Sequence, residues 1–510
     1  MNDLVSRHAL ILPFVDDKFI LFNGLYGAVD VIDQRTADII RDAQLSNTQP
    51  IELDNDMHDR LVRRGHLIDR QTEAEDLKIL SRMMLHLVDR NHISLIIMPT
   101  YNCNFRCTYC FERHRLTRGK DWLEHVMSPS IVDAVFNQMN IYRAKGHRFL
   151  GCTLHGGEPF LASNIDTVRN ICEHCRAFGL PIVRVATNGY DLDAYFDLIE
   201  EFNIRMIEIT LDGVGSMQDR RRPHLGGGSS YERIIKNISA ALKRKIRIRI
   251  RINVDRQNIN ELGKLHNELK TLGFIDDPCF DYYFKSVHEG TTPDPAQALT
   301  EVDVFDKMRE IGIDEREAIT CEQMYSDHLN IVWCILDKKR YPMLNGKHCD
   351  AEGGMLFVDP HGYIYSCWGT CADENFAIGE VDELSGRFNF NFNMVKWRTR
   401  RVHNIEDCRE CTHAMQCAGG CGVLALNQCG TLTSGHCDVF REVFNHVLTF
   451  KCREAWTAAR STELSKSWRE LLSRFDDSDR QTLLKTRDPK QTFETWNKVS
   501  TLKEMFGTKG

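Results

Sequence analysis

Short apolar runs alternate with longer amphipathic stretches through the middle of the chain, which is the pattern of βα units. The apolar runs predict six strands, at about 93–100, 149–156, 182–187, 206–211, 246–254 and 279–287. A stretch with helical periodicity separates each strand from the next. This order favours an α/β fold built on a parallel sheet, with residues 91–290 as one domain.

The two ends of the chain have different patterns. Near the start, apolar runs at 9–12 and 19–22 predict strands, and 33–43 and 57–64 predict helices. The second helix ends at Gly65, and a short apolar strand follows it. Residues 453–510 are polar and helix-prone. We therefore expect a small module of strands followed by helices at residues 1–75, an order that resembles a winged helix, and a helical tail.

The fifth predicted strand alternates basic and apolar residues. Arg247, Arg249 and Arg251 share one face and the isoleucines between them share the other. In a barrel the isoleucines would pack under the helices and the arginines would line the lumen. Glu208 would share the lumen face and could pair with Arg249. A solvated edge strand is the alternative.

Composition adds one unusual feature, the cysteines. The 510 residues are 42% hydrophobic and 27% charged, which excludes wholesale disorder and allows several globular units. A net charge of −7 argues against a dedicated nucleic-acid binder. With no long apolar run to span a membrane or act as a signal peptide, we expect a cytoplasmic protein. The 19 cysteines of such a chain predict metal or redox chemistry.

Three cysteines follow the first barrel strand as Cys103-x3-Cys107-x2-Cys110. The loop lies at the carboxyl end of the strand, where barrel enzymes have their active sites. Three thiolates leave one iron of a four-iron cluster without a protein ligand. A structural zinc knuckle with His114 nearby is the alternative.

Three further motifs follow the second, third and fourth strands: Gly156-Gly157-Glu158-Pro159, Thr187-Asn188-Gly189 and Thr210-Leu211-Asp212-Gly213. Each is weak alone, but their order behind the cysteine triplet is specific. With them, residues 90–290 resemble the radical S-adenosylmethionine (SAM) superfamily. The resemblance implies a partial, TIM-like (β/α)6 barrel. It also implies a [4Fe–4S] cluster on Cys103, Cys107 and Cys110, with SAM on its fourth iron.

The resemblance also implies which residues bind SAM. The family's glycine-rich turn contacts the amino group, its arginine after the fourth strand contacts SAM, and aromatic residues of the cysteine loop flank the adenine. The positions that match, together with Arg251 from the lumen row as a carboxylate partner, are Tyr109, Phe111, Gly156, Gly157, Glu158, Asn188, Thr210, Arg222 and Arg251. Gln218 replaces a histidine that many relatives carry.

A second cysteine set has the spacing Cys408-x2-Cys411-x5-Cys417-x3-Cys421, with Cys437 downstream and Cys349 and Cys367 upstream. It resembles the SPASM extension, which implies two auxiliary [4Fe–4S] clusters. One would be held by Cys408, Cys411, Cys417 and Cys437, and the other by Cys349, Cys367 and Cys421. The fourth ligand of the latter could be Cys371, Cys334 or Cys321, or be open. A pair of zinc sites is the alternative.

The N-terminal module resembles the PqqD-like peptide-recognition element, which implies that a leader peptide adds a strand to its sheet. A plain cap on the barrel is the alternative. We expect the domains to be 1–75 (recognition module), 76–90 (linker helix), 91–290 (barrel), 291–345 (bridging region), 346–452 (SPASM) and 453–510 (tail).

Together these resemblances imply a SAM-cleaving oxidoreductase. It would use a 5′-deoxyadenosyl radical to abstract hydrogen from a ribosomally made precursor peptide and install a modification such as a C–C, ether or thioether cross-link. A flavodoxin- or ferredoxin-type protein would donate electrons. An anaerobic sulfatase-maturing (formylglycine-generating) enzyme, a peptide epimerase, a small-molecule radical SAM dehydrogenase and a zinc-scaffolded binding protein are the alternatives.

Overall fold

The computed structural model describes residues 3–50, 52–85, 92–287, 294–313, 331–437, 440–459 and 461–506. Its contacts divide the chain into two compact units. Unit 1 comprises Met1–Arg90, Asp327–Cys349 and Thr399–Gly510, and unit 2 comprises Asn91–Ser326 and Asp350–Arg398. Residues 346–452, expected to form one SPASM domain, are thus shared between the two units.

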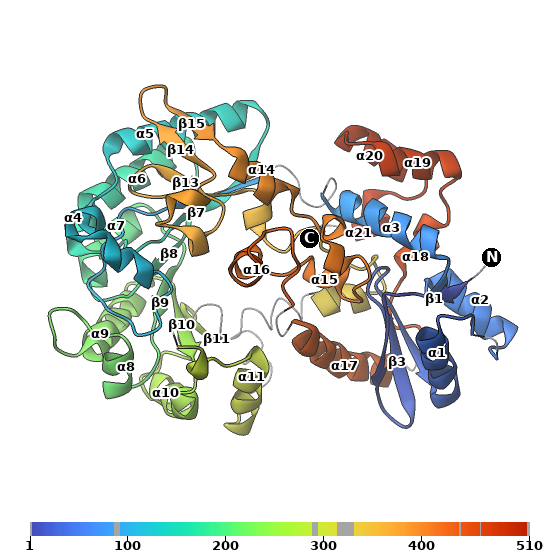
Figure 1. Ribbon diagram of the computed structural model, residues 1–510. Helices are drawn as coiled ribbons and strands as arrows, with labels where there is room; N and C mark the ends of the chain where they lie inside the picture. Colours follow the sequence, from blue (N-terminus) through green and yellow to red (C-terminus); the bar gives the residue numbers. More distant parts are fainter. Residues whose placement is uncertain are drawn as a thin grey trace. The chain divides into compact units, whose positions relative to one another are not determined.

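Six parallel strands in sequence order form the centre of unit 2 (Figure 1). They are β6 (His92–Ile97), β7 (Arg148–Leu154), β8 (Ile182–Thr187), β9 (Ile207–Thr210), β10 (Ile248–Val254) and β11 (Phe280–Ser286). The main helices of this unit are α5 (Pro129–Ala144), α6 (Ile165–Phe178), α7 (Phe196–Glu201), α9 (Ser230–Lys243), α10 (Leu262–Thr271) and α11 (Glu301–Glu310). The predicted α/β architecture and all six predicted strands are confirmed.

Four further strands extend this sheet beyond β6, which the sequence did not predict. β12 (Met355–Val358) runs parallel to β6, and β13 (Tyr363–Tyr365), β14 (Gly379–Asp382) and β15 (Arg387–Phe390) continue antiparallel. Gly362, with φ of +84°, makes the tight turn between β12 and β13. The first part of the predicted SPASM region is therefore part of the barrel sheet.

The two faces of β10 differ as the alternation predicts. Ile248, Ile250 and Ile252 are at most 1% exposed, each worth about 2 kcal/mol of burial. Arg249 and Arg251 are only partly buried on the other face. In the register of the sheet, Arg249 lies between Glu208 of β9 and Asp281 of β11. A row of charged side chains thus crosses the barrel face of the sheet.

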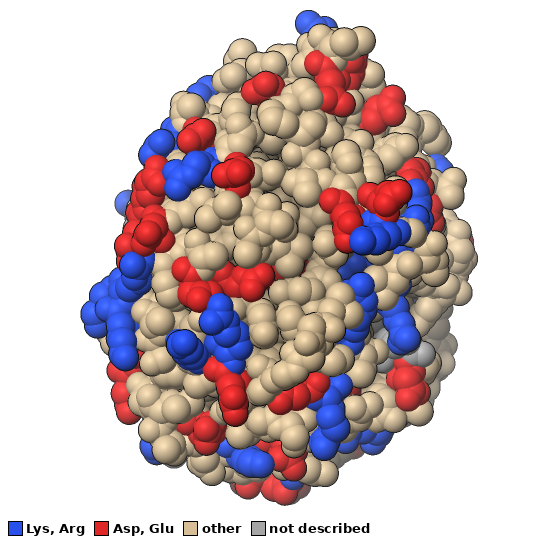
Figure 2. All heavy atoms as spheres, turned by 90° about the vertical axis from the view of Figure 1, so that its left-hand side faces the viewer, with Lys and Arg blue, Asp and Glu red and all other residues tan. Residues whose placement is uncertain are grey.

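Charges of both signs are interspersed on the side of unit 2 that Figure 2 presents. Exposed ion pairs lie on and beside α6, α7 and α9. These join Arg169 to Glu201 at 2.7 Å, Arg233 to Asp193 at 2.7 Å and Arg244 to Asp197 at 2.8 Å. Exposed pairs of this kind add at most about 1 kcal/mol each, so the buried apolar face of the sheet stabilises the barrel far more.

In unit 1 the chain begins with an antiparallel sheet of β2 (Ala9–Pro13), β3 (Lys18–Asn23) and β4 (Ala28–Asp33). α1 (Gln34–Ser46) and α2 (Asn55–Arg64) follow, and β1 (Leu4–Val5) pairs with β5 (Leu67–Ile68). The predicted strands and helices are confirmed, but β4 was not predicted. Asp33 ends β4 and caps α1, accepting a hydrogen bond from the Thr36 amide at 2.8 Å.

The rest of unit 1 is helical. α3 (Arg70–Met83) begins six residues before the expected linker helix. It is followed much later by α15 (Ala414–Cys417), α16 (Gly422–Cys429), α17 (Phe440–Ala459), α18 (Trp468–Leu472), α19 (Asp477–Lys485), α20 (Pro489–Trp496) and α21 (Leu502–Phe506). Trp468 and Trp496 are fully buried in one core with Tyr26 and Met415. Across the described residues, the chain contains no helix long and apolar enough to cross a membrane.

Two histidines of unit 1, the buried His66 and the partly buried His403, predict a loss of stability at mildly acidic pH. Burial lowers the pKa of His66 below its usual value of 6.5. It lowers the pKa of His403 from the same value to about 4. The unfolded chain therefore binds protons first, so stability present above pH 6.5 is lost as the pH falls below it. At about pH 5.5, His403 alone should lower the free energy of unfolding by about 1.4 kcal/mol relative to its value at about pH 7.5. Urea unfolding at the two pH values measures this difference. His403→Asn should reduce this pH dependence; an unchanged slope would contradict it.

Candidate active site and cluster sites

The cysteine triplet lies in the loop that leaves β6, at the carboxyl edge of the sheet. Burial raises the pKa of the Cys103 thiol to about 12 and that of Cys107 to about 11. Such thiols stay protonated near neutral pH until a metal displaces the proton. Among the residues that the structure describes, no three His, Cys, Asp or Glu side chains are grouped to hold a single metal ion.

The Gly156-Gly157-Glu158 turn after β7 lies directly against this loop. The Gly157 amide donates to the Thr100 carbonyl at 3.2 Å and the Glu158 amide donates to the Asn102 carbonyl at 2.7 Å. A Cβ on Gly157 would lie 2.2 Å from the Asn102 oxygen and 2.3 Å from that of Tyr101. Backbone-to-backbone contact therefore requires glycine at this position, beside the first cysteine.

Glu158 joins this turn to the next one. Its carboxylate accepts hydrogen bonds from the Thr187 hydroxyl at 2.6 Å and the Asn188 amide at 2.6 Å. Burial raises the pKa of Glu158 to about 7 despite these donors. The Asn188 side chain in turn donates to Asn104, inside the cysteine loop, at 2.7 Å. The motifs after β7 and β8 thus converge on the same loop.

The motif after β9 converges there through Tyr109. The Tyr109 hydroxyl donates to Asp212 and accepts from Arg222 at 2.9 Å and from the Asn253 amide at 3.2 Å. Burial alone would lower the pKa of Arg222, but Cys107, Tyr109 and Asp212 raise it well above its usual value. The guanidinium therefore stays charged beside the cysteine loop, where it could bind an anion.

Three other residues singled out in the sequence can be placed around this centre. Gln218, which replaces the relatives' histidine, accepts a hydrogen bond from the Asp212 amide at 2.7 Å and so stabilises the turn after β9. Phe111 is 41% exposed, with its ring centroid 6.4 Å from that of His155. Thr210 is the last residue of β9. The roles of Phe111 and Thr210 toward a ligand stay predictions.

The charged row on the barrel face is paired differently from the expectation. Glu208 lies 3.4 Å from Arg184 of β8, and Arg249 pairs with Asp281 of β11 through two contacts, one at 3.0 Å. The expected Glu208–Arg249 pair is therefore wrong, because each side chain has a closer partner on its other side. Arg247 also reaches Asp281, at 3.2 Å.

Arg251 is one row closer to the cysteine loop. Its Nε donates to the Asn253 side chain at 2.9 Å, and the described residues place no carboxylate within ion-pair distance of it. Burial, with Arg184 and Arg251 nearby, lowers the pKa of His155 to about 3, so this imidazole is neutral. Arg251 thus offers a cation that could bind an acidic group, whereas Arg184 is already paired with Glu208.

Removing a lumen arginine should weaken substrate binding more than it affects SAM cleavage. We expect Arg249→Ala to lower kcat/KM for the substrate by about 10- to 100-fold, since it removes a lumen cation and leaves Asp281 with only its Arg247 pair. Arg247→Ala is the matched control, because Arg247 is more exposed and shares the same carboxylate. Steady-state product formation and 5′-deoxyadenosine formation would be measured in parallel. Equal activity of the two variants would contradict a lumen role for Arg249.

The second cysteine set brings four thiols together in unit 1. Cys408, Cys411, Cys417 and Cys437 line one small hollow, with Arg441 at its side. The Arg441 guanidinium donates to the sulfurs of Cys411 at 3.4 Å and Cys437 at 3.6 Å. These are the four cysteines expected to share one auxiliary cluster, and a cysteine-only donor set suits iron–sulfur chemistry.

The other expected cluster set is spread over the chain's two units. Cys349 and Cys421 belong to unit 1 and Cys367 to unit 2, so their common cluster stays a prediction. Of its candidate fourth ligands, Cys371 is 1% exposed within an apolar core, and Cys334 lies 3.3 Å from Arg340. Cys321 lies outside the described residues.

Sequence reasoning missed several residues of these sites. His155 and Arg184 could have been found by extending the alternation of the lumen face to β7 and β8. Asp212 lay inside a recognised motif but was given no role. Arg441 follows Cys437 by four residues, and only that spacing hinted at its contact with the sulfur.

Comparison with known proteins is consistent with this geometry. Residues 97–269 match the family model described as the radical SAM superfamily. The cysteine-type anaerobic sulfatase-maturating enzyme of Clostridium novyi (strain NT) is 24% identical over 348 residues, 64% of this chain and 87% of that protein. The GTP 3′,8-cyclase of Brucella ovis is 27% identical over 182 residues, which is 36% of this chain and 50% of the cyclase.

A solved structure shares the fold. "Native anSMEcpe with bound AdoMet and Cp18Cys peptide" superimposes with a TM-score of 0.53 and 16% identity. The match covers 72% of this chain and 99% of the chain in that structure. More than a quarter of this chain therefore has no counterpart in that protein.

Proposed function

We propose that this chain, a radical SAM enzyme by virtue of its domain at residues 97–269, modifies a ribosomally made peptide. The observation that carries the proposal is the convergence of three strand-end motifs on the loop of Cys103, Cys107 and Cys110. The peptide substrate is supported by the sulfatase-maturating relatives and by the peptide bound in the similar structure.

A [4Fe–4S] cluster with bound SAM supplies one-electron cleavage of SAM and, through it, removal of a hydrogen atom from an unactivated C–H bond. The residues of the chain bind and orient the cluster, SAM and the substrate. The three cysteines hold the cluster, and the Gly156–Glu158 turn brings backbone close to the ligand. Arg222 offers a fixed cation beside the cysteines, and the lumen arginines bind acidic groups of the substrate.

Outside the barrel, the chain has parts that fit a peptide maturase. The sheet of β2, β3 and β4 is the proposed recognition element for a leader segment. Cys408, Cys411, Cys417 and Cys437 hold one auxiliary cluster, and Cys349, Cys367 and Cys421, with Cys371 as candidate fourth ligand, hold a second. A cluster held by these cysteines would supply a one-electron acceptor. A flavodoxin- or ferredoxin-type protein is the proposed electron donor.

A sulfatase-maturing activity is the second candidate. It is favoured by the match to 87% of the Clostridium novyi enzyme. That activity requires neither the N-terminal module nor the additional quarter of the chain that the similar structure lacks. A cross-linking activity on a precursor peptide uses both, which is why we place it first.

The test uses the reconstituted full chain under anaerobic conditions with dithionite. The substrate is a synthetic peptide encoded by a short reading frame next to the gene, compared with a cysteine-containing sulfatase peptide. Formation of 5′-deoxyadenosine and loss of two hydrogens from the precursor peptide are expected. Conversion of the sulfatase cysteine to formylglycine instead would establish the second candidate. No 5′-deoxyadenosine from either substrate would overturn both.

A further inference from the structure

The outer edge of β4 is already occupied by the chain itself. In an antiparallel strand alternate residues direct their amides and carbonyls to one side, and in β4 the outward residues are Val29 and Val31. The Val31 amide donates to the Thr462 carbonyl at 2.8 Å, and the Leu464 amide donates to the Val29 carbonyl at 2.9 Å. The Val29 amide donates to the Ser465 hydroxyl at 2.8 Å. Residues 462–465 therefore take the place of a fourth strand.

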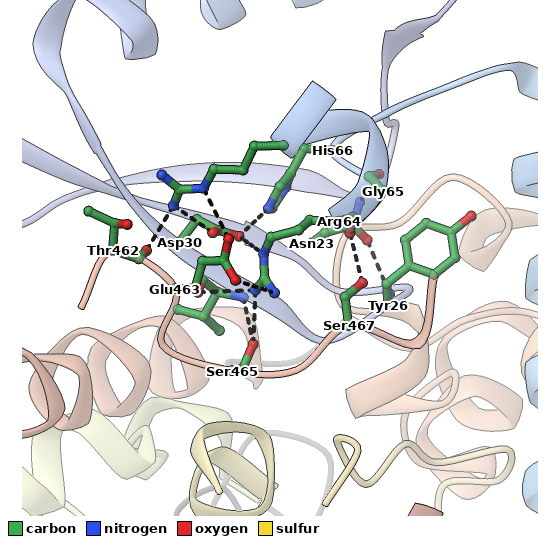
Figure 3. A network of polar contacts seen from close by, with 12 residues as sticks. Asn23, Tyr26, Asp30, Arg64, Gly65, His66, Thr462, Glu463, Ser465 and Ser467 are labelled. Atoms are coloured by element: carbon green, nitrogen blue, oxygen red, sulfur yellow. Dashed lines mark hydrogen bonds and ion pairs between the residues drawn. The ribbon is translucent and has the colours of Figure 1, made fainter. Parts of the chain in front are cut away.

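Charge holds this internal strand on the edge (Figure 3). Arg63 of α2 lies 2.6 Å from Glu463, and Arg60 lies 3.6 Å from it. The Arg60 guanidinium also donates to the Thr462 carbonyl at 3.0 Å. One acidic side chain and one carbonyl are thus bound by neighbouring arginines of a single helix.

The opposite edge of the sheet is poorly suited to a peptide strand. The outward residues of β2 are Ala9, Ile11 and Pro13, because the Gly24 amide donates to the His8 carbonyl on the inner side. Pro13 has no amide, and the Ala9 carbonyl accepts a hydrogen bond from the Gln44 side chain at 3.1 Å. Only Ile11 offers a free pair of backbone groups, so the β4 edge is the better strand-binding site.

We propose that the β4 edge is a binding site for an extended acidic peptide segment, and that residues 462–465 act as an internal competitor for it. This inference rests on the proposed peptide-modifying function, because the peptide that displaces residues 462–465 is part of the substrate. The internal strand defines what the site accepts. It has a glutamate facing Arg60 and Arg63 and, next to it, a leucine that is 1% exposed.

The buried carboxylate of this network keeps its partners when the internal strand leaves. Asp30 is fully buried, but its partners are Arg60, Arg64 and His66 of the module itself, at 2.8, 2.6 and 2.7 Å. Burial alone would raise the pKa of Asp30, but these neighbours lower it below its usual value, so the carboxylate stays ionised and paired. Glu463, by contrast, is 35% exposed and returns readily to water.

The segment can also leave without unfolding the tail. The Ser467 hydroxyl donates to the Arg64 carbonyl at 2.8 Å, and the buried Trp468 ring donates to the Pro342 carbonyl at 2.7 Å. These contacts anchor the chain just after the internal strand. Residues 462–465 can therefore exchange with a peptide while α18 stays in its core.

The test measures binding of a fluorescent peptide with the internal strand's own sequence, Ser-Thr-Glu-Leu-Ser-Lys (residues 461–466), to the full-length chain. Glu463→Gln and, separately, Leu464→Ser weaken the internal strand without altering the β4 edge. We expect each to tighten peptide binding about tenfold, because removing a competitor raises the fraction of open sites. Thermal melts verify that both variants are folded.

Arg63→Gln, combined with Glu463→Gln, is the matched control for recognition of the acidic side chain. It should abolish the preference for the glutamate peptide over one with glutamine at that position. If neither Glu463→Gln nor Leu464→Ser binds the peptide more tightly than the parent chain, the β4 edge is permanently closed and the proposal is overturned. 5′-Deoxyadenosine formation, measured on the same samples, reports separately on the proposed function.

Discussion

Cys107→Ala should abolish SAM cleavage and remove one cluster's worth of iron. With three clusters the reconstituted chain contains about twelve irons and about twelve sulfides, and the variant should contain about eight of each. The loss is complete because two thiols cannot hold a cluster that also has a ligand-binding iron. Iron and sulfide analysis and 5′-deoxyadenosine formation measure the two effects.

Cys279→Ala is the matched control for that variant. Cys279 lies in the same unit, is partly exposed, and its thiol donates to the Lys245 carbonyl at 3.7 Å. It should keep the full iron content and activity. If Cys107→Ala kept twelve irons, the triplet would not be the site of a cluster. Bound zinc without sulfide in the parent chain would instead establish the zinc-scaffold alternative.

The barrel was predictable because its strands are apolar runs that alternate regularly with stretches of helical periodicity. Alternation along β10 even gave the orientation of its side chains. It could not give their partners, since Glu208 and Asp281 are both register neighbours of Arg249 and only side-chain geometry chooses between them. The alternation along a strand predicts which face of the sheet a side chain lies on, whereas its ion-pair partner depends on distances in the folded structure.

The strands that were missed share a different property. β12 has four residues and pairs with β6, which lies more than 250 residues earlier in the chain. β4 carries a buried aspartate, Asp30, which interrupts its apolar run. Its charge is compensated by arginines of α2, and the local sequence pattern does not predict such a partner. Elements stabilised mainly by distant contacts are the ones that sequence periodicity leaves out.

The cysteine sets were predictable to different degrees for a related reason. Spacing within a loop is local, and the structure gathers Cys408, Cys411, Cys417 and Cys437 around one hollow as expected. The set of Cys349, Cys367 and Cys421 joins segments of two units, where spacing alone carries less information. Mutating the members of each set, with iron counting, would therefore be most informative for the second set.

Gly157→Ala should reduce SAM cleavage by at least about 100-fold while the cluster cysteines remain intact. A Cβ at 2.2 Å from the Asn102 oxygen cannot be accommodated, and both neighbours are backbone atoms that cannot rotate away. The turn must therefore separate from the cysteine loop, which displaces Glu158 and its hydrogen bonds. A displacement of about 1 Å at a catalytic centre is enough for a loss of this size.

Gly263→Ala in α10 is the matched control, because its Cβ would lie 3.7 Å from Ile311, an ordinary contact distance. That variant should retain activity and gain about 1 kcal/mol of helix stability. Measuring 5′-deoxyadenosine formation and SAM binding for both variants separates the site from general destabilisation. Full activity of Gly157→Ala would mean that the close contact between the turn and the cysteine loop is dispensable for SAM cleavage.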